Sequence, residues 1–201
     1  MTATEPRHLL AAMSCSKDEL VDRVLEDTAH TLQARGYRVG GYLQRQAPAT
    51  DGCCAPMYLE HIENGERSRI SQALGAGARG CRLDPRALAR LSASLLAELD
   101  AGMQLLVLNR FGKGESEGQG FRAVIERAFQ GGIPVLTAVR PGYMQAWRAF
   151  GGDYAQELRL DRGPVLAWCL SALDGQGTGP LAGHLQPITV GADPGDRRNP
   201  A

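Results

Sequence analysis

The sequence predicts an α/β fold with three layers, in which a mostly parallel β-sheet lies between helices. Three observations predict it. Short continuous apolar runs alternate with segments whose apolar residues recur at helical spacing. A strand, a capped helix and a second strand open the chain, and such a unit normally builds a parallel sheet. An Asn-Gly pair between two strand-like segments adds an antiparallel β-hairpin.

The first strand-helix-strand unit lies near the N-terminus. The apolar residues 8–13 predict a buried strand. Ser16 and Glu19 have the spacing of a capping box, which favours a helix start, and the helical pattern that follows ends at Gly36. Residues 37–43 predict the next strand, which we expect to lie parallel to the first.

The hairpin is expected over about residues 57–71, with Asn64 and Gly65 at its turn. The preceding residues 44–56 are rich in loop-forming side chains and predict an irregular connection. We expect the hairpin to be inserted as an antiparallel addition to the parallel sheet.

The middle of the chain contains the clearest strand. Asp84 is a natural N-cap and Pro85 suits the first turn, so a helix is predicted to begin there. The continuous apolar run at residues 104–109 predicts a strand buried on both faces. Residues 110–120 are polar and glycine-rich, and they predict a loop.

The remaining elements complete a single domain over residues 1–173. They are a helix at 121–129, a strand at 133–139, a short helix at 143–150, an edge strand at 157–160 and a helix at 164–173. Residues 174–201 are dominated by Gly, Pro and charged side chains, a composition that predicts a disordered tail.

Composition excludes several classes of function. Lys+Arg and Asp+Glu both number 22, so no overall field attracts nucleic acid or an anionic membrane. No apolar segment is long enough to span a bilayer, which predicts no membrane insertion and a cytoplasmic protein. Cys53, Cys54 and Cys81 lack the spacing of a metal site, and no role is assigned to them.

Ligands of open parallel sheets bind at the carboxyl ends of the strands, and the first loop expected there is incomplete. A phosphate-binding loop needs glycines followed by Lys and a hydroxyl residue. Residues 13–18 contain no glycine, and Lys17 is followed by Asp18. Ser16 and Lys17 could form a weak anion site at the helix start, or simply a capped helix with a solvated lysine.

The second loop lacks the acids of a magnesium-nucleotide site. Such a site needs an acid at the strand end and a group that positions water, but Asn109 and Arg110 stand there. The nucleotide-binding motifs are therefore degenerate, and an enzyme is disfavoured. Arg110 and Lys113 suit an oxyanion, although Glu115 and Glu117 could instead neutralise them. A third loop, after Val139, is expected at the same edge.

Several segments carry a resemblance to a bacterial family, the domain of unknown function 2478. They are Arg69-Ile70-Ser71-Gln72, Gly80-Cys81-Arg82-Leu83-Asp84-Pro85, residues 105–120 and Gly132-Ile133-Pro134-Val135-Leu136. The resemblance covers about residues 8–172. It implies an association with molybdenum metabolism, because genes of this family lie near molybdate-transport genes. More distantly, the layout resembles small P-loop nucleoside triphosphatases of the thermophile type.

Three hypotheses for the function follow. The leading one is a non-catalytic accessory or binding protein on a P-loop-like scaffold, which binds a small oxyanion such as molybdate, or a protein partner, in molybdenum homeostasis. The alternatives are a divergent nucleotide-binding hydrolase or transferase and a protein-interaction module without a small ligand; the oligomeric state, a homodimer included, stays open. The candidate ligand-binding residues are Ser16, Lys17, Arg82, Asn109, Arg110, Lys113 and Glu117. No catalytic or metal-binding residue is predicted.

Overall fold

The computed structural model describes residues 8–14, 18–46, 55–72 and 83–175 and contains a seven-stranded sheet. The strands are β1 (Leu10–Ser14), β2 (Val39–Gln46), β3 (Met57–His61), β4 (Arg67–Arg69), β5 (Leu105–Phe111), β6 (Val135–Val139) and β7 (Ala155–Leu158). The helices are α1 (Asp18–Ala34), α2 (Pro85–Asp100), α3 (Lys113–Ser116), α4 (Arg122–Gln130), α5 (Met144–Gly151) and α6 (Arg162–Asp174). Two short 3₁₀ turns are η1 (Pro141–Tyr143) and η2 (Gly152–Tyr154).

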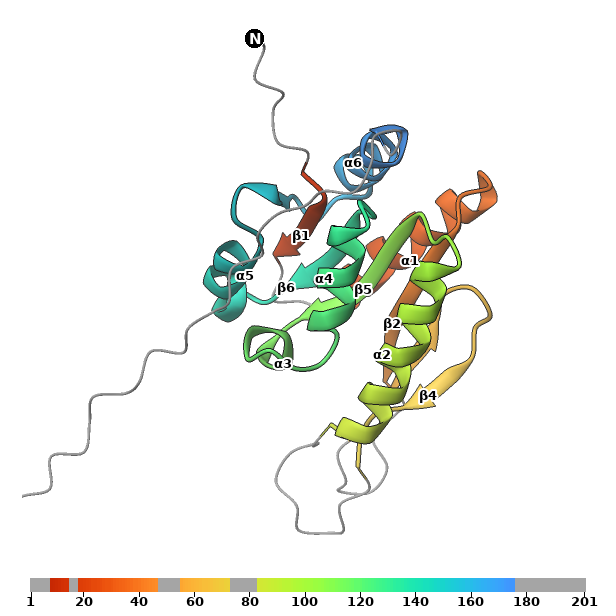
Figure 1. The fold of residues 1–201 in the computed structure, drawn as a ribbon, viewed down its shortest axis with the longest axis vertical. Coiled ribbons are helices and arrows are strands. Elements are labelled where there is room, and N and C mark those ends of the chain that lie inside the picture. The colour runs from red at the N-terminus through yellow and green to blue at the C-terminus, as the bar shows by residue number, and fades with distance from the viewer. Residues whose placement is uncertain (1–7, 15–17, 47–54, 73–82, 176–201) are drawn as a thin grey trace, which may run out of the picture.

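The sheet is mostly parallel and carries its hairpin at one edge. The strand order is β4-β3-β2-β5-β6-β1-β7, and the five strands from β2 to β7 in this order run parallel (Figure 1). Strands β3 and β4 continue the sheet in antiparallel fashion beside β2. Gly65 has a φ of 70°, the left-handed conformation that the hairpin turn requires. The predicted parallel sheet and its antiparallel hairpin are both confirmed.

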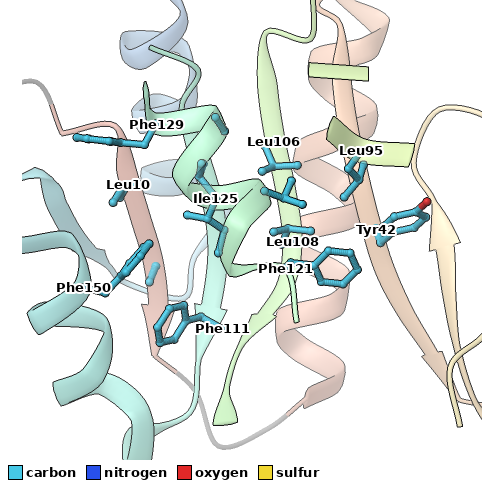
Figure 2. Close-up of a cluster of buried hydrophobic side chains, with 14 of the residues drawn as sticks. Leu10, Tyr42, Leu95, Leu106, Leu108, Phe111, Phe121, Ile125, Phe129 and Phe150 are labelled. Carbon is cyan, nitrogen blue, oxygen red and sulfur yellow. The ribbon is translucent and has the colours of Figure 1, made fainter. Parts of the chain in front are cut away.

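Helices cover both faces of the sheet, which gives the three layers that the sequence predicts (Figure 1). Alternate residues of β1 show this most clearly, since Leu10 and Ala12 pack toward α4 and α5 while Ala11 and Met13 pack toward α1 and α6. Figure 2 shows the first of these clusters, in which aromatic and aliphatic side chains from the strands and helices pack together on one face of the sheet.

Local capping signals position the helices as expected. The Asp84 side chain accepts hydrogen bonds from the backbone amides of Arg86 (2.9 Å) and Ala87 (3.3 Å), with Pro85 at the first helical position. Asp161 caps α6 in the same way, through the amide of Gly163 at 3.0 Å. The predicted capping residue of the first helix, Ser16, lies outside the described residues.

The largest departure from the sequence prediction lies around residue 110. Arg110 and Phe111 were expected in a loop, but they belong to β5, which continues through Phe111. The glycine-rich segment that follows contains one short helix, α3. The tail predicted from residue 174 lies outside the described residues from 176 onward, and α6 itself extends to Asp174.

Four charged side chains tie the hairpin to α1. Arg45 on β2 contacts Glu26 on α1 at 2.6 Å and Glu60 on β3 at 2.9 Å, and Glu60 also accepts a hydrogen bond from Arg67 on β4. The Arg45 guanidinium, with help from Arg67, lowers the pKa of Glu60 below its usual 4.5.

Glu60→Gln is therefore expected to reduce the free energy of unfolding by about 1–3 kcal/mol at neutral pH. A carboxyl group with a lowered folded-state pKa stabilises the protein above its unfolded-state pKa, and this contribution disappears as the pH falls through the folded-state pKa. The difference between wild type and variant should shrink below about pH 4.5. Urea denaturation over a pH series measures it, with Asp100→Asn, in an exposed pair with Arg127, as the control that changes little.

No helix among the described residues is long and apolar enough to cross a membrane.

The two edge strands of the described sheet, β4 and β7, have three and four residues.

Candidate functional site

The topology predicts a ligand crevice at the carboxyl ends of the neighbouring strands β1 and β6. Strand β1 is followed by α1 on one face of the sheet, and its neighbour β6 is followed by α5 on the other face. When two neighbouring strands are followed by helices on opposite faces of the sheet, a crevice forms between them, and ligands of open α/β sheets bind there. The segments that follow β5 and β6 lie at this edge, as expected.

A β-bulge at the end of β5 directs the polar side chains. Leu108 pairs with Thr137 of β6 and Phe111 pairs with Val139, so Asn109 and Arg110 together oppose one residue. Simple alternation would place Arg110 on the same face as Leu108. The extra residue instead returns Phe111 to that face, and both polar side chains reach toward α1.

Asp22 of α1 receives these two side chains. Asn109 Nδ2 donates a hydrogen bond to Asp22 Oδ1 at 2.7 Å, and Arg110 Nη2 lies 3.7 Å from the same oxygen. A carboxylate only accepts hydrogen bonds, so the amide nitrogen must face Asp22. The Asn109 Oδ1 atom is then buried without a hydrogen-bond partner among the described residues. Asp22 was not predicted, because an acid on a helix 87 residues earlier in the chain gives no local signal.

Glu115 closes the loop that follows β5. One of its carboxylate oxygens accepts a hydrogen bond from the amide of Gly112 at 2.9 Å, and the other accepts one from the amide of Phe121 at 3.0 Å. Gly120, with a φ of 62°, lies so close that a Cβ there would approach Glu115 Oε1 to 2.2 Å. The buried Glu115 carboxylate therefore joins the two ends of the loop.

Among the contacts of the described residues, neutralisation of a loop cation by Glu115 or Glu117 is found at Lys113. Its ammonium lies 3.8 Å from Glu117, and the Lys113 side chain is 71% exposed. An ion pair this exposed contributes at most about 1 kcal/mol, so a ligand can displace it readily. Arg110 contacts Asp22, and Glu115 uses both oxygens on backbone amides.

A cavity of about 830 Å³ opens beside this loop, between the hairpin strands, the start of α2 and the end of β5. The charged and amide side chains that line it near β5 and β6 are Asn109, Arg110, Lys113, Glu115 and Arg140. Its apolar lining includes Tyr42, Met57, Leu59, Ile70, Leu88, Phe111 and Phe121. Burial raises the pKa of the Tyr42 hydroxyl, and the Glu98 carboxylate raises it further, so this lining residue stays neutral.

Some of the predicted ligand-binding residues line the cavity, together with residues that were not predicted. Among the predicted ligand-binding residues, Asn109, Arg110 and Lys113 line it, and Glu117 contacts it only through Lys113. Ser16, Lys17 and Arg82 lie outside the described residues. Arg140 was not named from the sequence, although the loop after Val139 was expected at this edge.

Metal and thiol chemistry find no support in the described part of the chain. No group of three or more His, Cys, Asp or Glu side chains there could hold a metal ion. Burial raises the pKa of the Cys169 thiol to about 12, so this cysteine is not a reactive thiolate. Cys53, Cys54 and Cys81 lie outside the described residues.

Comparisons with known proteins agree with this architecture. The model of a family described as protein of unknown function (DUF2478) matches residues 10–168. The molybdenum import ATP-binding protein ModC 2 of Bradyrhizobium diazoefficiens is 35% identical over 164 residues, which are 82% of this chain but 18% of that protein. This chain therefore spans less than a fifth of that relative.

A solved structure supports the fold class. The crystal structure of THEP1 from the hyperthermophile Aquifex aeolicus is similar with a TM-score of 0.52 at 14% identity. The match covers 83% of this chain and 98% of THEP1. Together with the family match, this likeness confirms both resemblances expected from the sequence and the P-loop NTPase-like fold.

Proposed function

Since this chain belongs to the DUF2478 family of proteins of unknown function, its function must be argued from its site, and we propose that it is a non-catalytic binding protein for an anionic ligand in molybdenum homeostasis. One observation carries the proposal. The bulge of β5 directs the Arg110 side chain to Asp22 at the carboxyl edge of the sheet, and Arg110 is also a lining residue of the cavity that Lys113 and Arg140 line.

The charge balance of the cavity supports an anion. Arg110, Lys113 and Arg140 supply three positive charges, and Glu115 is the one carboxylate among the described lining residues. Two further carboxylates act from outside the lining, since Asp22 pairs with Arg110 and Glu117 pairs with Lys113. Because both oxygens of Glu115 already accept hydrogen bonds from amides, it competes weakly for these cations. Guanidinium groups bind oxyanions through paired N–H donors, and a lysine adds a point charge.

The end of β5 favours binding without a metal ion. Phosphoryl transfer on a scaffold of this type relies on acids that hold magnesium. Asp22 is an acid that contacts the end of β5, and it binds the Asn109 amide and the Arg110 guanidinium. We infer that Arg110 supplies a fixed positive charge where a hydrolase would hold a metal, which disfavours the nucleotide hydrolase or transferase.

The molybdenum assignment rests on the relative. Its name describes a molybdenum import ATP-binding protein, and a segment similar to this chain makes up 18% of it. Segments joined in one polypeptide in one organism commonly act together when they occur on separate chains. We therefore propose that the ligand is molybdate or a related oxyanion, either free or as part of a larger molecule. We also propose that an ATP-binding protein of this kind is the protein partner. The cavity beside Asn109 favours this hypothesis over an interaction module without a ligand.

Calorimetric titration with molybdate, tungstate, sulfate and phosphate tests the proposal. At least one oxyanion is expected to bind, equally well with and without a metal chelator. Lys113→Ala should weaken binding by about tenfold, which corresponds to about 1.4 kcal/mol. Arg127→Ala removes the same charge from an exposed pair on α4 and should leave binding unchanged. Absence of heat with every oxyanion, and no effect of Lys113→Ala, would contradict the proposal.

A further inference from the structure

We propose that the ligand of this cavity is an organic phosphate with a flat aromatic body, which lies between the hairpin and α2 while its phosphate contacts the cations at β5 and β6. This inference rests on the anion binding proposed above and specifies the class of ligand. Size, lining and the position of the charges each support it.

The cavity is far larger than an inorganic oxyanion needs. A tetrahedral oxyanion occupies on the order of 100 Å³, a few times the volume of a water molecule. The cavity measures about 830 Å³, which lies within the range of pockets for small organic molecules. An oxyanion at the cations would leave most of the cavity volume to water.

The wall away from the cations suits an aromatic ring. Leu59 and Ile70 from the hairpin are 5% and 4% exposed, and Leu88 of α2 faces the same cavity. Tyr42 and Phe121 add aromatic rings, whose centroids lie 5.9 Å apart. Flat aromatic groups pack on such side chains with favourable geometry, in addition to the apolar area that they bury. Gln44 of β2 also lines the cavity and offers its amide to heteroatoms at the ring edge.

The part of the apolar lining that comes from the hairpin lies several strands away from the cations. Arg110 lies in β5, Lys113 comes directly after it and Arg140 follows β6, whereas Leu59 and Ile70 come from the hairpin on the other side of β2. From β3 to β6 the sheet spans three strand spacings, or about 14 Å. A ligand that reaches both ends is therefore elongated, with its negative charge at one end.

Among the described residues, this cavity is lined by the half of the sheet that carries the hairpin. None of the described residues of β1 and α1 lines it. Its lining comes from the hairpin, β2, α2, β5 and the segments after β5 and β6. The inferred aromatic body is consequently placed over the half of the sheet that carries the hairpin.

Titration with three probes tests the inference. α-Naphthyl phosphate presents the phosphate and the aromatic body together. Inorganic phosphate presents the phosphate alone, and α-naphthol presents the aromatic body alone. The combined probe is expected to bind at least about tenfold more tightly than either fragment, because its phosphate and ring bind at the two ends of one cavity. Lys113→Ala should weaken both phosphate-containing probes and leave α-naphthol unchanged.

A substitution in the apolar wall separates this inference from the proposed function. Leu88→Trp fills the end of the cavity that would hold the aromatic body. It should weaken the binding of α-naphthyl phosphate about tenfold and leave the binding of inorganic phosphate unchanged. Leu96→Trp, on the same helix but outside the cavity lining, is the matched control. Ala89→Trp, at an exposed lining position, repeats the test if thermal denaturation shows that Leu88→Trp does not fold.

The outcomes distinguish the two claims. If oxyanions bind but α-naphthyl phosphate binds no more tightly, or if the tryptophan in the wall affects both phosphates equally, the aromatic ligand is wrong and anion binding stands. If none of the anionic probes binds, both the inference and the proposed function are wrong.

Discussion

Phe111→Ala is expected to lower the free energy of unfolding by about 3–5 kcal/mol. The ring is 1% exposed, and its centroid lies 5.3 Å from that of Trp147 and 5.5 Å from that of Phe150 on α5. Figure 2 shows Phe111 and Phe150 on neighbouring elements of the same cluster. Truncation removes the contact that joins the end of β5 to α5 and leaves a cavity that rigid neighbours cannot fill.

Urea denaturation followed by circular dichroism measures this loss. Phe111→Leu is the matched control, because it keeps an apolar side chain at the position and should lose less than half as much. A loss for Phe111→Ala within about 1 kcal/mol, the average for point substitutions, would mean that the bulge does not place this ring in the core.

Glu115→Ala is expected to cost about 3 kcal/mol or more and to weaken anion binding as well. The substitution removes two hydrogen bonds to an ionised acceptor and leaves the buried amide of Phe121 without one. The loop that carries Lys113 then loses the contact that joins its ends. Hydrogen exchange at the amides of Gly112 and Phe121 should accelerate strongly, which NMR detects residue by residue.

Glu117→Ala is the control for this prediction. It removes an acid of the same loop, but one whose pairing with Lys113 is exposed and contributes at most about 1 kcal/mol. Stability should hardly change, and anion binding should stay equal or improve because Lys113 loses its competitor. Equal destabilisation by the two substitutions would rule out a special role for Glu115 in closing the loop.

Local chemistry was sufficient to predict most of the fold. The Asp84 cap with Pro85, the Asn64-Gly65 turn and the apolar run of β5 each determine their own element from a few adjacent residues. The parallel order follows from connections between such elements. These signals act over a few residues, so they predict each element even where its ends are displaced by a residue or two.

The candidate site was harder to predict because its contacts are not local. The bulge at Asn109 and Arg110 is visible only in the pairing with β6, and it reverses the face on which Arg110 lies. Asp22 meets Asn109 across 87 residues of sequence. The sequence offered pairing of Glu115 with Arg110 or Lys113 as one alternative, whereas folding brings two backbone amides to its carboxylate.

The edges of the sheet limit how this protein can assemble. Strand β4 has three residues with arginine at both ends, and β7 has four residues, one of which is Glu157. Such short, charged edges offer few backbone groups to a strand from another molecule. Growth of one sheet across several molecules, the route to fibrous aggregates, is therefore disfavoured at both edges. A second copy, or the proposed ATP-binding partner, is expected to dock on helices or loops.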